Sequence, residues 1–598
     1  MTLLQALSAY YDRLEGVAAP GWSPEKFGWC VVIDRDGAVV DVEDRHDVSG
    51  KKPRVRTYVV PAAVKRTVGV APNFLWDKSA YVLGRTAGEG RRTAQEHEAF
   101  VAMHLKRLAG TSDAGLAALS AFLESWKPER FDESSKFRTE MLDANFMFRL
   151  DGDREFLHER PAARALVEAA SADQDSESVF CLVSGEIGAP ARLHPTIKGV
   201  EGAQTAGAAL VSFNLDAFTS LGKVQGGNAP TSAAAAFRYG AALNHLLTRD
   251  GPNRVRRPIG DATVVFWADS GDRKSAEAAD SLFGDWLGGD ISEADADAAE
   301  TREIALQMEA VAKGRPLSEL RPDIEPGTRF HVLGLSPNAA RLSVRFWLTD
   351  SLDAFARRLA QHYMDLRVEP PPFRWGVAPS FNQILANTTA LQRKFENIPP
   401  LLAGEMMRAI LSGARYPQSL LATVLIRLRA GDDPLSGWHV AVICAVLNRD
   451  HRLDPKKEDM PVSLAIDAPS KAYQLGRLFA VLETAQRMAL GRVNASIRDR
   501  YFGAASATPA SVFPLLLRGA QNHLGKLRKA GKGGWLEREI EDILDKLSPD
   551  LPRALPLAEQ GRFVVGYYHQ RKEQFKGRPD AAAELEAADS ADDEGDNS

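Results

Sequence analysis

FHVLGLSPNAARLSVRFWLTD, residues 330–350, is the stretch at which the character of this 598-residue sequence changes. It begins with an apolar run, and every second residue over 342–348 is apolar, as in a strand buried on one face. Strand-like runs recur before this stretch, whereas the apolar spacing after Asp350 is helical almost throughout. The sequence therefore predicts an α+β fold, with a mixed α/β region over residues 1–350 followed by an all-helical region.

The first region contains several strand patterns. Two apolar runs, 29–33 and 39–42, flank Asp36-Gly37, a dipeptide that favours a tight hairpin turn. The basic segment KKPRVRTYVVP, residues 51–61, is predicted to form another strand. Further strands are expected at 179–183, 208–213, 262–267 and 330–333, helices at 2–15, 99–108, 116–126 and 233–247, and an acidic loop at 284–299.

The second region is predicted to consist of helices. Apolar spacing indicates helices at 401–411, 419–428 and 438–447, followed by a charged connector at 448–460. We therefore expect a helical middle region over residues 351–458. Four amphipathic patterns then predict a small helical bundle over 459–579, and an acidic, disordered tail is expected over 580–598.

The net charge of −5 is unevenly distributed. The tail carries eight acidic and no basic side chains, so the rest of the chain, with 74 basic and 71 acidic residues, has a net charge of +3. Residues 471–578 hold 19 Lys or Arg against 10 Asp or Glu, a local net charge of +9. Such a surface attracts polyanions, and nucleic acid is the leading candidate. A helical scaffold that docks onto an acidic protein remains the alternative.

The remaining composition excludes several classes of protein. Three widely spaced cysteines argue against a disulfide framework, and we expect a soluble, cytoplasmic protein because the sequence has no secretory signal and no membrane-spanning run. The sequence contains no GxxxxGK[ST], GxSxG, HExxH or strand-associated GxGxxG motif. We therefore expect a chain that is not an enzyme and needs no cofactor.

One enzyme hypothesis stays open on the residues alone. Glu186, His194 and Asp216 are able to bind a metal ion, although their spacing matches no known ligand frame. A metal-dependent phosphohydrolase is thus an alternative, while our expectation is that the chain has no metal site.

Two loops carry residues suited to nucleic acid. In the segment 71–84, the amide of Asn73 could contact base edges and Phe74 could wedge between base pairs. The alternative is that Phe74 and Trp76 are core residues and Asn73 caps a turn. In the segment 212–232, Lys223 could neutralise a phosphate while Gln225 or Asn228 touches a base, the alternative being a glycine-rich hairpin before a helix.

These segments also carry a family resemblance. The sequence resembles the Csd-type large subunit of the type I-C CRISPR interference complex, known as Cascade. The similar motifs, in family order, are PNFLWDKSAYVLG (72–84), SGEIGAPARLHPTIKGVEGAQTAGAALVSFN (184–214), GKVQGGNAPTS (222–232), AALNHLL (241–247), VVFWA (264–268), HVLGLSPNAARLSVRFW (331–347) and AYQLGRLFAVLETAQ (472–486).

The resemblance implies a binding function in antiviral defence. Members of the family read the short adjacent motif, the PAM, in double-stranded target DNA, while guide RNA reads the target by base pairing. The implied partners are the guide-RNA ribonucleoprotein with its backbone and 5′-handle-binding subunits, the helicase-nuclease, a small subunit made by internal translation, and anti-CRISPR inhibitors. No membrane is implied. The family also helps to open the duplex into an R-loop.

The resemblance assigns residues as well. It makes Asn73 and Phe74 the candidates for PAM contact and strand separation, and Lys223, Gln225 and Asn228 the candidates for further DNA contacts. It also makes Met460 the candidate internal start, ahead of a bundle that resembles the small subunit and would hold single-stranded DNA or guide RNA. From charge alone, Lys51, Lys52, Arg54 and Arg56 are expected to contact duplex phosphates.

Overall fold

The computed structural model describes residues 1–575 apart from 15–18, 49–52, 65, 67–68, 173–177, 214, 289–297, 373–380, 391–396, 492 and 548–549. The acidic tail lies outside the described residues. The chain divides into two compact units, one of Met1–Thr196 with Val211–His245 and one of Ile197–Leu210 with Leu246–Ser598. This division differs from the boundaries expected from the sequence, because one apolar core runs from Val255 in the second unit to Tyr568 in the last helix.

The first unit contains a four-stranded sheet in the order β3-β2-β6-β5. Strand β2 (Trp29–Ile33) pairs antiparallel with β3 (Val39–Asp44) and parallel with β6 (Asn145–Leu150), which in turn pairs with β5 (Asp77–Lys78). The predicted hairpin is confirmed, and Gly37 in its turn has φ of +82°. Helices α3 (Thr93–Leu108) and α4 (Ala114–Ser125) contribute to the core of this sheet.

A second pair of strands forms a separate ribbon in the first unit. Strand β1 (Trp22–Phe27) pairs antiparallel with β4 (Arg56–Pro61), so the predicted basic strand forms over its C-terminal part. Further elements of this unit are α2 (Ser79–Val82), α5 (Arg130–Glu133), α6 (Pro161–Ala172), β7 (Val179–Phe180) and β8 (Ile187–Gly188). Strand β7 is thus shorter than the predicted strand at 179–183.

The first helix of the chain packs against a helix from far along the sequence. Helix α1 (Leu3–Tyr11) and helix α7 (Ala233–Leu246) meet where the rings of Tyr11 and Phe237 lie edge to face, with centroids 5.9 Å apart. The N-cap of α1 is Thr2, whose side chain and that of Gln5 form a capping box. Residues 211–245 therefore fold with the N-terminal unit although 197–210 belong to the other one.

The second unit begins with a five-stranded sheet in the order β11-β12-β13-β10-β9. Its long strands are β11 (Thr263–Asp269), β12 (Arg329–Asn338) and β13 (Arg341–Ser351), and its short strands are β10 (Ala208–Ala209), which lies beside β13, and β9 (Thr196–Ile197), which lies at the edge. The stretch 330–350 contains strands where its pattern predicts them, and β12 and β13 pair as an antiparallel hairpin. The expected strand at 208–213 is reduced to two residues.

Three helices lie between β11 and β12 in the chain: α8 (Arg273–Gly288), α9 (Ala298–Ala312) and α10 (Leu317–Leu320). The acidic loop predicted at 284–299 is wrong at both ends, because α8 continues to Gly288 and α9 begins at Ala298, while residues 289–297 lie outside the described residues. The last turns of α8 bury Phe283 and Trp286 in the core, and this burial favours a helix although Gly284 and Gly288 lie in the same turns.

From α11 onward the described chain has helices and no further strand, as expected. They are α11 (Leu352–Asp365), α12 (Phe381–Thr388), α13 (Pro400–Ser412), α14 (Gln418–Arg429), α15 (Trp438–Leu453), α16 (Lys471–Leu490), α17 (Ile497–Ala507), α18 (Pro509–Lys529), α19 (Gly534–Leu544) and α20 (Leu557–Phe575). Helix α15 extends into the predicted connector at 448–460, and α17 is an additional helix of the bundle. No helix within the described ranges is both long and apolar enough to cross a bilayer.

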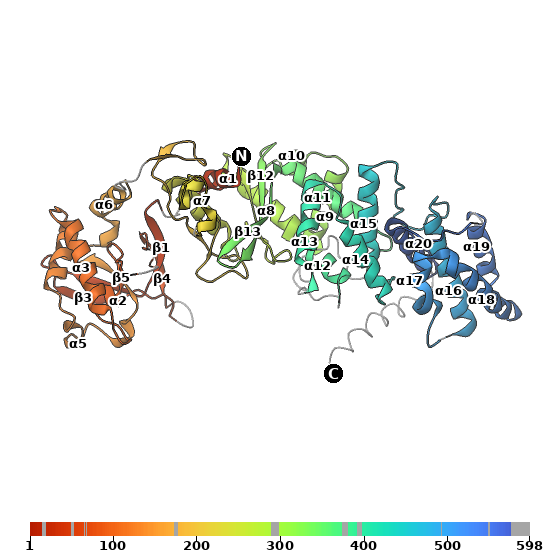
Figure 1. Cartoon of the computed structure of the whole chain (residues 1–598), viewed down its shortest axis with the longest axis horizontal. Coiled ribbons are helices and arrows are strands. Elements are labelled where there is room, and N and C mark those ends of the chain that lie inside the picture. The colour runs from red at the N-terminus through yellow and green to blue at the C-terminus, as the bar shows by residue number, and fades with distance from the viewer. Residues whose placement is uncertain are drawn as a thin grey trace. The chain divides into compact units, whose positions relative to one another are not determined.

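Two glycines let the central helices of the bundle touch backbone to backbone. A Cβ atom on Gly476 of α16 would lie 2.0 Å from the carbonyl oxygen of Phe563, and one on Gly566 of α20 would lie 2.1 Å from that of Tyr473. Any larger residue at either position would force these helices apart. Figure 1 shows α16, α18, α19 and α20 side by side in this part of the second unit.

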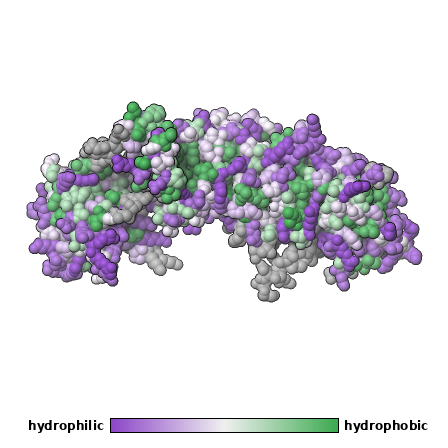
Figure 2. All heavy atoms as spheres, viewed as in Figure 1, coloured by the Kyte–Doolittle hydropathy of each residue, from purple (hydrophilic) through white to green (hydrophobic). Residues whose placement is uncertain are grey.

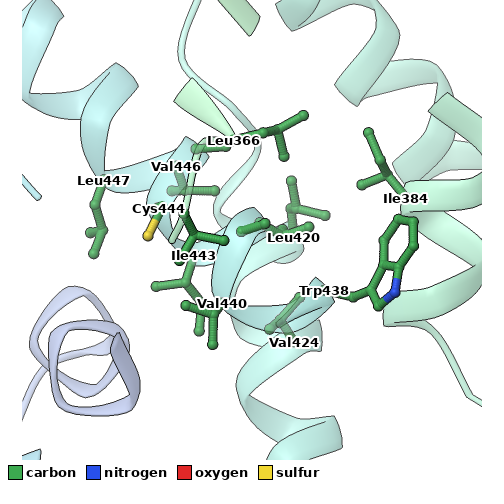
Figure 3. Packing of buried hydrophobic residues seen from close by; sticks show 14 of the residues in the cluster. Leu366, Ile384, Leu420, Val424, Trp438, Val440, Ile443, Cys444, Val446 and Leu447 are labelled. Atoms are coloured by element: carbon green, nitrogen blue, oxygen red, sulfur yellow. The ribbon is translucent and has the colours of Figure 1, made fainter. Parts of the chain in front are cut away.

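The bundle shares its core with the helices before it. Ile443 and Leu447 of α15 and Leu420 and Val424 of α14 belong to one apolar cluster (Figure 3). A Cβ atom on Gly561 of α20 would lie 2.9 Å from Ile443 Cγ2, so α20 packs closely on α15. The predicted middle region and bundle are therefore continuous in packing.

Candidate nucleic-acid interface

The segment 71–84 is folded into the first unit. Asn73 and Phe74 are only 4% and 5% exposed. The side-chain Oδ1 of Asn73 accepts a hydrogen bond from the Val64 backbone N–H at 2.8 Å. The Phe74 ring is stacked on His104, with centroids 5.5 Å apart, and the exposed Arg107 guanidinium lies 5.0 Å from the centre of the Phe74 ring.

Asp77 organises the rest of this segment. Its buried carboxylate accepts the backbone N–H groups of Asn73 and Lys78 at 2.8 Å and is ion-paired with Arg66. Burial raises the pKa of Asp77, and these donors oppose that effect. Trp76 is also buried and donates its indole N–H to the carbonyl of Pro61 at 2.7 Å.

This arrangement matches the structural alternative for the segment: Phe74 and Trp76 are core residues and Asn73 fixes a turn. The role of Phe74 as a strand-separating wedge stays a prediction, and in this conformation its ring is buried beneath Arg107. The exposed side chain of this segment is that of Lys78, the last residue of β5 and the N-cap of α2.

The segment 220–228 has the opposite character, because its tip projects as a tight turn. Ser220 and Lys223 exchange backbone hydrogen bonds of 3.3 and 2.9 Å. Between them, Leu221 and Gly222 have φ of +51° and +74°, the sign that a type I′ hairpin turn requires at both central positions. Glycine adopts this conformation freely, whereas leucine adopts it at a cost in free energy.

Lys223 and Gln225 are both exposed on this loop, as DNA contacts must be. Asn228 is half-buried and donates its side-chain amide N–H groups to the carbonyls of Lys223 at 3.0 Å and Gln225 at 3.1 Å. These donors hold the loop in shape, so the geometry gives Asn228 a positioning role beside two exposed neighbours.

Leu221 is a candidate that the sequence analysis did not name. Apolar residues reach the visible surface in several places (Figure 2), and Leu221 is the most exposed of the large apolar side chains described, at 95%. An apolar side chain at the tip of a strained, rigid turn is suited to insertion between base pairs. The sequence signal for this candidate is the pair Leu221-Gly222, because a hairpin turn of this type favours Asn-Gly and a leucine at its first central position is unusual.

The base of this loop is anchored through Cys181. Its Sγ accepts backbone N–H groups from Ser184 at 3.4 Å and from Ser232, the residue before α7, at 3.2 Å. Burial raises the pKa of Cys181, but these hydrogen bonds outweigh burial and lower the pKa to about 6. Cys181 thus links the β7–β8 turn to Ser232, which follows the 220–228 loop and precedes α7.

The predicted phosphate contacts are described only in part. Lys51 and Lys52 lie outside the described residues. Arg54 forms an isolated backbone bridge with Asp47, and Arg56 begins β4. Both arginine side chains are exposed, and neither forms an ion pair with the part of the chain that the structure describes.

The structure does not bring the candidate metal ligands together. Glu186 and Asp216 are exposed, whereas His194 is half-buried with its Nδ1 2.7 Å from the hydroxyl of Tyr239. Burial lowers the pKa of His194. Among the described residues, no three His, Cys, Asp or Glu side chains form a group that could hold a metal ion.

Helix α18 concentrates positive charge on one face. Arg518, Lys526 and Lys529 are exposed and lie within about 80° of one another at 100° per residue. None of the three forms an ion pair within the described ranges, whereas Arg528 is paired with Glu537. We call these three residues the α18 basic face. These exposed side chains account for part of the +9 charge counted in the sequence and are accessible to phosphate groups.

Met460 is buried in this unit. Its side chain is 3% exposed, and its Sδ lies 3.2 Å from Nη1 of Arg562 on α20. A chain that began at Met460 would retain this contact but lose α14 and α15, against which α20 packs. Internal translation from Met460 stays a prediction.

Comparison with known proteins identifies the family to which the chain belongs. A family model described as CRISPR-associated protein (Cas_Csd1) matches residues 7–575, nearly the whole chain. The chain belongs to this Csd1 family of CRISPR-associated proteins, as the resemblance implies. No curated protein matches the sequence.

Proposed function

We propose that this chain is the non-catalytic large subunit of a type I-C Cascade complex and reads the PAM in double-stranded target DNA. The observation that carries the proposal is the family match over residues 7–575. The exposed turn at 220–228 supports it, because this turn presents a cation, an amide and an apolar tip within a few residues.

Each part of the turn has a role in this proposal. Lys223 neutralises a backbone phosphate and Gln225 contacts a base edge, while Leu221 enters the stack as the duplex opens. Insertion of an apolar side chain unstacks a base step at a cost of about a few kcal/mol, which contacts to the opened strands offset. Asn228 keeps the turn rigid, so that little entropy is lost on binding.

The helical part supplies a second, sequence-independent surface. The α18 basic face neutralises phosphates of the displaced strand or of the guide RNA, and this interaction weakens steeply with salt. In the proposed setting the chain acts in the cytoplasm with the guide-RNA ribonucleoprotein. It also helps to form the R-loop and docks the helicase-nuclease that cleaves the target.

The direct test compares reconstituted complexes with and without this chain. Mobility shifts are measured on duplexes that are identical in the guide-complementary stretch and differ only in the flanking bases. The proposal expects the complete complex to discriminate among flanks and the complex without this chain to lose that discrimination. Equal binding to all flanks by the complete complex contradicts PAM reading. Loss of nucleic-acid affinity at physiological salt would favour the protein-scaffold alternative.

A further inference from the structure

A pocket lined by four arginines lies in the second unit and includes no residue of the segments 71–84 and 220–228 or of the α18 basic face. It has a volume of about 270 Å³ and forms where α11 meets α15 and the turn after α13. Its lining residues are Ala354, Arg357, Arg358, Gln361, Gly413, Arg449 and Arg452.

Helical spacing brings these side chains to one place. On α11, residues 354, 357, 358 and 361 follow the i, i+3, i+4, i+7 pattern of a single face. On α15, Arg449 and Arg452 are three residues apart and share a face as well. Gly413, with φ of +74°, ends α13 and lies 3.6 Å from the Arg358 side chain, measured from the position that a Cβ would occupy.

A buried carboxylate fixes two of the arginines. Asp365 is 2% exposed and accepts from Nε of Arg449 at 2.9 Å and from Nη2 of Arg452 at 2.7 Å. Three of the four other N–H groups of Arg449 donate to the carbonyl oxygens of Ala409 and Ala414 and to the hydroxyl of Tyr416. Arg449 is therefore a rigid positive wall of the pocket.

The other arginines leave positive charge uncompensated. Arg358 pairs with Asp350 at 2.7 Å, so two carboxylates face four guanidinium groups, a local net charge of +2. Arg357 is exposed and forms no ion pair with any residue that the structure describes, and the side chain of Arg452 is 36% exposed. The pocket thus combines held guanidinium groups with N–H donors that remain open to solvent.

We propose that this pocket binds one phosphate group of a nucleic-acid backbone. Guanidinium forks match phosphate oxygens in shape and charge, and prior fixation by Asp365 lowers the entropy lost on binding. The proposal rests on the proposed function, because it gives the strand held by the helical part a fixed anchoring point. It adds a site for which neither charge patterning nor the family match gave a sign.

A pair of variants at Ala354 tests the pocket without weakening the fold. Ser351 caps α11 and its hydroxyl accepts the Ala354 N–H at 3.2 Å, so Ala354 holds the third helical position. The backbone N–H of Ser351 already donates to the Asp350 carboxylate at 2.8 Å, and Glu and Gln are both good helix formers at position 354. Ala354→Glu adds a negative charge to the pocket, whereas Ala354→Gln adds nearly the same volume without charge.

The measurement is fluorescence anisotropy of labelled oligothymidine with the full-length chain over a range of salt concentrations. Ala354→Glu and Arg357→Ala are expected to weaken binding about tenfold at low salt. The slope of the logarithm of the binding constant against the logarithm of the salt concentration is the salt slope. Arg357→Ala is expected to reduce its magnitude by about 0.7, the value for one phosphate on a single strand. Ala354→Gln and Arg256→Ala, an exposed arginine of the same unit outside the pocket, are expected to bind as the wild type does.

The outcomes separate this inference from the proposed function. If the wild-type chain binds the oligonucleotide and all four variants bind equally well, the pocket proposal fails while the proposed function stands. Lack of any binding by the wild-type chain contradicts the pocket proposal and the strand-holding part of the proposed function together. Protection against heat unfolding by inorganic phosphate, with oligonucleotide affinity unchanged in the variants, identifies a site for free anions and contradicts the proposal.

Discussion

The ring of Phe74 lies on the ring of His104, with an interplanar angle of 18° and 5.5 Å between centroids. His104 Nε2 also accepts the backbone N–H of Leu75 at 2.8 Å, while its Nδ1 donates to the carbonyl of Phe100. A segment whose motif suggests an exposed DNA wedge is thus attached to α3 through stacking and hydrogen bonding. This relationship changes which variants can test DNA binding.

Phe74→Ala is expected to lower the free energy of unfolding by about 3–5 kcal/mol, because it leaves a cavity beneath Arg107. Phe180→Ala is the matched control, since Phe180 is 60% exposed and its truncation is expected to change stability little. Denaturant unfolding of the full chain measures both. Unaltered unfolding of Phe74→Ala would show that the ring leaves its pocket in solution and would revive it as a wedge.

Gly476→Ala is expected to destabilise the second unit strongly, because the added methyl would lie 2.0 Å from a backbone oxygen of α20. Gly519→Ala in α18 provides the contrast, since nothing lies within 4 Å of its Cβ position. That substitution is expected to stabilise the helix by about 0.5–1 kcal/mol. Melting temperatures that move in the same direction for both variants contradict the close α16–α20 packing.

Acidification is expected to destabilise the chain between about pH 6.5 and pH 4. Burial lowers the pKa of His104 and His569 to about 4 and that of His362 to about 3. As the pH falls below about 6.5, these histidines become protonated in the unfolded chain but stay neutral in the folded chain. The free energy of unfolding therefore decreases until the pH reaches their pKa in the folded chain. Aspartates of lowered pKa, such as Asp432 at about 2, contribute only at more acidic pH.

Thermal unfolding at pH 7 and pH 5 measures this effect. A lower melting temperature at pH 5 is expected, and His104→Gln should reduce the difference because it removes one of the titrating groups. Equal melting temperatures at the two pH values would mean that these imidazoles are protonated in the fold.

Removal of the α18 basic face is expected to lower the salt slope of oligonucleotide binding by about 2, the sum for three phosphates on a single strand. The variant is Arg518→Ala with Lys526→Ala and Lys529→Ala. Lys313→Ala serves as the control because Lys313 is exposed but paired with Glu309. A slope that does not change would place the strand elsewhere on the chain.

Much of the fold could be predicted because its signals are local. The hairpin around Gly37 and the helices of the second unit follow from turn chemistry and apolar spacing. The contact of Gly476 with α20 could not be predicted, since it joins residues about ninety positions apart and depends on how two helices cross. The end of helix α8 could not be predicted either, because the burial of Phe283 and Trp286 favours the helix where glycines predict a loop.

The candidate site was predictable to a smaller degree. Lys223 and Gln225 could be selected from a glycine-rich loop and both are exposed, while their contact with DNA stays a prediction. The burial of Phe74 depends on His104, a partner thirty residues away, which a pattern of aromatic residues does not reveal. The arginine pocket could not be found at all, because Arg357 and Arg449 come together only in the folded chain.

The central claim, that the turn at 220–228 reads the PAM, is tested most directly by a mobility shift of the reconstituted complex on duplexes that differ only in their flanks. Gln225→Ala and Leu221→Ser are the variants, since both side chains are exposed and their loss should leave the fold intact. Leu182→Ser, at another exposed apolar residue of the same unit, is the control. We expect the control complex to retain flank discrimination and both loop variants to lose it. Full discrimination by the loop variants would contradict the claim.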